Sequence, residues 1–185
     1  SMIPLAFINY GGIQAIQTLW AGPWMLNITG YTPLESATGL FWINITMLIS
    51  YFIWGYILPK ISEYGIGSIK LIKLGLPVSY FSLFLIIYFG ENAGAFLFTI
   101  YIMTSIVISL TQPAIALNFS KNLAGKSLTS YNVFLFSGTF FIQWGIGLVI
   151  DLCNNKGFDI VSSYRISFSA FLILCVLSYI FFIYL

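Results

Sequence analysis

The segment from 127 to 150, SLTSYNVFLFSGTFFIQWGIGLVI, contains no charged residue. A helix rises about 1.5 Å per residue, so about 20 apolar residues cross the roughly 30 Å hydrocarbon layer of a bilayer. The run is continuous, whereas a strand of a membrane barrel alternates apolar and polar residues over about ten positions. The segment therefore predicts one membrane-spanning helix.

The same pattern recurs along the whole chain. Of its 185 residues, 59% are hydrophobic and 6% are charged, whereas roughly 25% of the residues in soluble domains are charged. The third run reaches the length of a span when Lys70 and Lys73 extend their amines to the interface. The composition excludes a soluble globular protein, and we expect an all-α integral membrane protein whose partner is the lipid bilayer. The predicted spans are 4–28, 37–58, 69–89, 95–119, 127–150 and 166–185.

The distribution of basic residues predicts the orientation of these spans. Lys60, Lys70 and Lys73 lie between the second and third spans, and Lys121 and Lys126 lie between the fourth and fifth. Loops that are rich in lysine and arginine stay on the cytoplasmic side of the membrane. We therefore expect a multi-pass protein with both termini in the cytoplasm.

A weak internal repeat with a period of about 91 residues divides the chain into two three-span units, 1–90 and 91–185. Pro23 in the first span corresponds to Pro113 in the fourth, and Lys73 corresponds to Arg165. Units with an odd number of spans insert in opposite orientations, as in many secondary transporters. The sequence thus predicts six transmembrane helices in two inverted three-helix repeats.

Polar and aromatic residues gather on one face of four predicted spans. Lipid offers no hydrogen-bond partners, so such faces turn toward the protein interior or toward a water-filled pathway. The alternative is that the amides only join neighbouring helices, where each contact contributes about 0.6 kcal/mol. Because the faces occur on spans one, two, four and five together, we expect them to line a substrate cavity. The predicted cavity residues are Gln14, Gln17, Trp20, Trp24, Asn44, Tyr51, Tyr101, Ser105, Gln112, Asn132, Thr139 and Gln143.

Prolines and glycines within the spans predict bends and close packing. Pro23 and Pro113 remove backbone hydrogen bonds and should bend the first and fourth spans. Gly138, Gly145 and Gly147 on the fifth span should let a neighbouring helix approach closely.

Several chemistries lack the residues that they need. The chain has no histidine, its two cysteines are far apart in sequence, and no acidic residue lies deep in a predicted span. Metal ligation and histidine-based catalysis require such groups. We expect no enzyme activity, no metal, no cofactor and no nucleic-acid partner.

Two stretches resemble a known family of membrane proteins. GGIQAIQTLWAGPWMLNITGYTPLESATGLFWINI (11–45) and LAGKSLTSYNVFLFSGTFFIQWGIGLVID (123–151) are similar to the C-terminal six-helix half of bacterial major facilitator superfamily transporters. In the loop after the second span, Gly55, Lys60 and Gly65 match the family's signature, but Pro59 replaces its aspartate.

This resemblance implies a function and a location. The chain would be the C-terminal half of a secondary-active permease in the bacterial inner membrane, moving a small-molecule substrate by alternating access. It would form one wall of a central cavity, and an N-terminal six-helix half would form the other. Two alternatives remain at this point: a six-span protein that homodimerises to form its own pathway, and a helical membrane scaffold that does not transport.

Overall fold

The computed structural model describes residues 2–184, except for the side chains of Lys121 and Asn122. The described residues form helices, turns and short loops, with no strand among them, and this confirms the all-helical class. In chain order the elements are α1 (Met2–Ala15), the π-turn η1 (Ile16–Trp20), α2 (Ala21–Asn27), α3 (Pro33–Glu63), α4 (Ser68–Phe89), the 3-10 turn η2 (Gly90–Asn92), α5 (Ala95–Ser105), the 3-10 turn η3 (Ile106–Leu110), α6 (Thr111–Ala116), α7 (Lys121–Asn155) and α8 (Ile160–Tyr184).

Five helical segments are long and apolar enough to cross a membrane: Pro33–Glu63, Ser68–Asn92, Ala95–Ala116, Leu123–Asn155 and Ile160–Tyr184. They coincide with the second to sixth predicted spans. The first predicted span is also helical, but η1 divides it, and neither α1 nor α2 alone has the length of a span.

Both interruptions of helical geometry lie directly before a proline for which we expected a bend. Pro23 is the third residue of α2, and Pro113 is the third residue of α6. Proline has no N–H to donate, and its ring clashes with the carbonyl group four residues earlier. That carbonyl belongs to Leu19 within η1 and to Ser109 within η3. Proline alone does not impose such a turn, because Pro59 in α3 and Pro77 in α4 lie in uninterrupted α-helix.

The packing of the helices relates the two halves of the chain. Helix α1 packs along α7 and against α8, and α5 packs along α3 and against α4. Helices α4 and α8 contact each other. The contacts of α1 with α7 and α8 thus correspond to those of α5 with α3 and α4, whereas the extensive α7–α8 contact has no counterpart of similar extent between α3 and α4.

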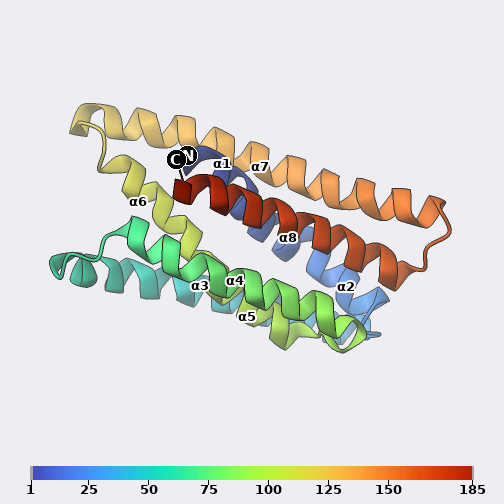
Figure 1. Cartoon of the computed structure of the whole chain (residues 1–185). Coiled ribbons are helices and arrows are strands. Elements are labelled where there is room, and N and C mark those ends of the chain that lie inside the picture. Colours follow the sequence, from blue (N-terminus) through green and yellow to red (C-terminus); the bar gives the residue numbers. More distant parts are fainter. Residues whose placement is uncertain (1, 185) are drawn as a thin grey trace.

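The two ends of the bundle carry different loops. Figure 1 shows both chain ends near the loops that join α3 to α4 and α6 to α7, and the other three connections at the opposite end. The loops at the end with the termini are those flanked by Lys60, Lys70 and Lys126. At the opposite end Thr32 caps α3, because its side chain accepts a hydrogen bond from the Glu35 amide and the Glu35 carboxylate accepts one from the Thr32 amide.

A close approach of two glycines fixes α1 against α7. A Cβ atom added to Gly138 would lie 2.2 Å from the carbonyl oxygen of Phe7, and one added to Gly11 would lie 2.5 Å from the carbonyl carbon of Gly138. Gly147 lies against the Trp20 ring, whereas a Cβ atom at Gly145 would meet open space. Close packing therefore applies to Gly138 and Gly147 and not to Gly145.

Candidate functional site

A cluster of neutral polar side chains joins three helices around the η1 turn. Gln17 donates a hydrogen bond from Nε2 to Asn44 Oδ1 on α3. Gln143 on α7 donates from Nε2 to the Thr18 hydroxyl, at 2.8 Å. Gln14, at the end of α1, donates to the Tyr10 hydroxyl at 3.4 Å. We call Tyr10, Gln14, Gln17, Thr18, Asn44 and Gln143 the amide cluster.

One polar atom of the amide cluster is buried without a partner. Gln17 is 9% exposed, and its Oε1 accepts no hydrogen bond. Buried side-chain oxygens in proteins are almost always bonded to protein or to ordered water, and an unpaired one points to a water or a ligand. Asn44 and Thr18 are exposed, so the cluster reaches the surface of the bundle. Gln17 therefore supplies a free acceptor next to an open polar face.

The η1 turn determines how these side chains are presented. A π-turn holds one residue more than an α-helical turn and rotates the side chains that follow it, and such turns are frequent at functional sites. Within η1, Gln17 turns toward α3 and Thr18 toward α7. Trp20, the last residue of η1, donates from its indole nitrogen to the Gln143 carbonyl oxygen at 3.2 Å. The turn thus anchors α7 to the same segment that carries the unpaired oxygen.

Trp24, the second tryptophan that we expected to line the cavity, belongs to the core. Trp24 is fully buried, and its ring packs against Phe98, Tyr164 and Phe168, with ring centroids 4.8–6.0 Å apart. Its indole nitrogen has no hydrogen-bond partner. Trp24 therefore stabilises the packing of α2 against α5 and α8 and does not present its ring to solvent.

The structure brings only some of the other predicted cavity residues to the amide cluster. Thr139 lies one helical turn before Gln143, and its hydroxyl donates to the Leu135 carbonyl oxygen of its own helix. Tyr101 and Ser105, each 3% exposed, lie in the core, and the Ser105 hydroxyl has no partner. Tyr51 is half-buried beside Tyr10 of the cluster. Gln112 and Asn132 are half-buried and make no hydrogen bond to the cluster through their side chains.

The sequence did not reveal a second polar network around a buried asparagine on α1. Asn9 is 5% exposed and donates to the Leu5 carbonyl oxygen at 2.9 Å and to the Ser178 hydroxyl at 3.0 Å. Its Oδ1 accepts from the Tyr80 hydroxyl at 2.9 Å. The interhelical partners, Tyr80 and Ser178, come from α4 and α8, for which the sequence predicts no polar face. An amide within an otherwise apolar run was the one available signal.

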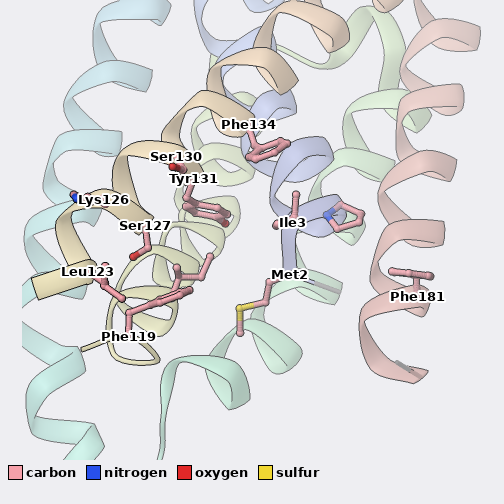
Figure 2. Close-up of a pocket in the computed structure, with 12 residues that line it drawn as sticks. Met2, Ile3, Phe119, Leu123, Lys126, Ser127, Ser130, Tyr131, Phe134 and Phe181 are labelled. Carbon is pink, nitrogen blue, oxygen red and sulfur yellow. The ribbon is translucent and has the colours of Figure 1, made fainter. Parts of the chain in front are cut away.

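The cavity shown in Figure 2 has a volume of about 780 Å³ and lies elsewhere, at the end of the bundle that holds both termini. Its walls are mainly apolar and include Ile3, Phe134 and Phe181. Ser127 and Ser130 add hydroxyl groups, but in Figure 2 the Lys126 ammonium lies on the side of α7 away from Phe181. This cavity suits apolar groups, and none of the predicted cavity residues lines it.

Among residues 2–184, no group of three or more His, Cys, Asp or Glu side chains is arranged to hold a metal ion. Cys153 and Cys175 are both free thiols. The polar groups of the amide cluster are amides and hydroxyls.

Comparisons of the chain with protein-family models, with curated proteins and with solved structures found no match.

Proposed function

We propose that this chain is the C-terminal six-helix half of a secondary transporter of the major facilitator type. In this proposal α1, α3, α6 and α7 form one wall of a cavity, and a second six-helix half supplies the opposite wall. A small solute crosses the membrane as the two halves expose the cavity to each side in turn. In addition to the five long helical segments, the α1–η1–α2 segment also crosses the membrane and brings the number of spans to six.

The amide cluster is the observation that carries this proposal. Its hydrogen bonds join the helices that carry Gln17, Asn44 and Gln143, and one buried acceptor is left unpaired. Trp24 and Ser105 also carry an unpaired polar atom, but they lie in the core. Gln17 differs from them because it bonds to the exposed Asn44, so water or a solute can complete its bonding.

The symmetric packing supports the inverted-repeat part of the proposal. The first helix of each three-helix unit packs against the second helix of the other unit. The π-turn at 16–20 and the 3-10 turn at 106–110 interrupt the first helix of each unit at corresponding positions. Transporters built from such repeats often interrupt their helices where the substrate binds.

The surface of the bundle supports its place in a membrane. Large apolar side chains remain exposed along α3, such as Phe41 and Phe52, and along α7, such as Phe136 and Trp144. We place the lysine-bearing end in the cytoplasm of a bacterial cell, because positively charged loops stay inside.

Cysteine accessibility tests whether the amide cluster faces water. In a variant whose two native cysteines are replaced, single cysteines at Thr139, Gln143 and Asn44 are labelled in membrane vesicles with a charged maleimide reagent. We expect rapid labelling at these three positions, because a charged reagent reacts only where water reaches the thiol.

Ile173 on α8 is the matched control, because it is 59% exposed. It lies near the middle of α8, a helix for which the sequence predicts no polar face. A cysteine there should remain unlabelled, since it faces lipid. Equal protection of Thr139, Gln143, Asn44 and Ile173 would mean that the polar face is dry, and the transporter proposal would then be wrong.

A further inference from the structure

The side-chain amides of the cluster each donate one of their two N–H groups to an acceptor within the protein. Gln14 Nε2 donates to Tyr10, Gln17 Nε2 donates to Asn44, and Gln143 Nε2 donates to Thr18. Asn44 donates its own Nδ2 to the Leu40 carbonyl oxygen at 2.7 Å. Each side-chain amide in the cluster therefore already has a protein acceptor for its nitrogen.

The side-chain oxygen atoms of the same glutamines accept no hydrogen bond within the described part of the protein. Gln17 Oε1 is buried and unpaired. No hydrogen bond from the described residues reaches Gln14 Oε1 or Gln143 Oε1, and both side chains are half-buried. An amide oxygen has two lone pairs and can only accept. The cluster thus presents amide oxygens as acceptors, and the buried one on Gln17 has no partner at all.

No charged residue belongs to the parts of the chain that form the cluster. Residues 1–34, 36–59 and 127–150 contain no Asp, Glu, Lys or Arg, and these ranges hold every cluster residue. A charged solute that leaves water needs a countercharge or a dense set of hydrogen bonds to offset its desolvation. The cluster offers no countercharge to an anion and no carboxylate to a cation.

We infer that the amide cluster binds an uncharged solute through the solute's own O–H or N–H donors, with Gln17 Oε1 as the central acceptor. This inference rests on the proposed function and specifies its substrate class. Neutral polyols are the simplest members of this class. A solute that only accepts hydrogen bonds should bind poorly, because it leaves the buried Gln17 Oε1 unpaired.

Ligand protection of a cysteine at Thr139 tests the inference in membrane vesicles. The probes are glycerol, xylitol, sorbitol and myo-inositol, each paired with its fully O-methylated derivative, together with gluconate as an anion and choline as a cation. We expect at least one polyol to slow labelling about threefold when its concentration is twice its Kd. Its O-methylated partner and the two ions should give no protection.

Gln17→Met removes the acceptor and keeps an unbranched side chain, so it should abolish protection by the polyol. Gln143→Met is the second variant and should weaken protection. Thr99→Val on α5 is the matched control, because its hydroxyl bonds only to the Ala95 carbonyl oxygen of its own helix. The control should keep full protection.

The outcomes separate the two proposals. If the cysteine at Thr139 is labelled but no polyol protects it, or if an O-methylated probe or an ion protects it, the proposed substrate class is wrong. The proposal that this face is exposed to water would still hold. A cysteine at Thr139 that is not labelled at all overturns the proposed function itself. Protection that persists in a folded Gln17→Met variant also overturns the inference.

Discussion

Asn9 and Gln17 are two buried amides on the same helical segment, and they differ in how completely they are bonded. Asn9 uses both hydrogens of its amide nitrogen, and its oxygen accepts from Tyr80. Gln17 makes one hydrogen bond through its side chain, to Asn44, and its oxygen is unpaired. The same chemical group therefore closes a network at one position and leaves one open at the other.

The surroundings explain this difference. The interhelical partners of Asn9 come from α4 and α8, which pack against each other, and the Ser178 hydroxyl in turn donates to the Cys175 carbonyl oxygen. The partner of Gln17 comes from α3, and Asn44 is exposed. A closed network stabilises one packing arrangement, whereas an open one keeps bonding capacity for a ligand.

Substitution of Gly138 should have the largest effect, because it disturbs the helix that carries both amides. Gly138→Val places a branched side chain where the Phe7 carbonyl oxygen lies, so α1 must move away from α7. We expect a loss of about 3 kcal/mol in the free energy of unfolding. Unfolding in mixed detergent micelles, followed by circular dichroism, measures this loss.

Gly145→Val is the control for this experiment, since a side chain at that position on the same helix meets open space. It should change the free energy of unfolding by only a few tenths of a kilocalorie per mole. Similar losses for both variants would show that the two glycines matter through helix propensity and that the α1–α7 contact is not the cause.

Asn9→Leu should have the next largest effect. The substitution removes three hydrogen bonds and leaves the buried Tyr80 hydroxyl without its acceptor. At about 0.6 kcal/mol for each bond, we expect a loss of about 2 kcal/mol in the same unfolding measurement. A loss below that of a single bond would mean that the network around Asn9 contributes no more than ordinary helix packing.

The sequence predicts much of this fold, because the rules of the membrane leave few choices. Runs without charge locate the five candidate spans, and Pro23 and Pro113 locate the two irregular turns. The type of each turn is not predictable in this way. Proline forbids one hydrogen bond, but this does not specify whether a π-turn or a 3-10 turn replaces it.

The sequence predicts less of the candidate site. The helical period places Gln14 and Gln17 on one face of the first span, and Gln143 on a polar face of the fifth. It does not identify Thr18 as the partner of Gln143, because η1 rotates that hydroxyl toward α7. Trp24 follows the same period but packs into the aromatic core, since three rings of other helices surround it.

Tyr80→Phe tests the closed network at a single bond. The change removes the hydroxyl that donates to Asn9 Oδ1 and keeps the ring, which also packs edge-on against Tyr179 at 5.7 Å between centroids. We expect a loss of about 0.6 kcal/mol in the free energy of unfolding. The double variant with Asn9→Leu should lose no more than Asn9→Leu alone, because the two changes break the same bond.

Gln17→Leu should have the smallest effect on stability, although it exchanges the same kind of group as Asn9→Leu. It removes one hydrogen bond, to Asn44, and at the same time removes an acceptor that is already buried and unpaired. These two contributions have opposite signs and similar size, so we expect a change of less than about 0.5 kcal/mol in the free energy of unfolding. A loss as large as that of Asn9→Leu would show that Gln17 is a structural amide like Asn9. The hydrogen bonds of Gln17 would then serve to stabilise the fold, and the unpaired oxygen would no longer support a ligand site.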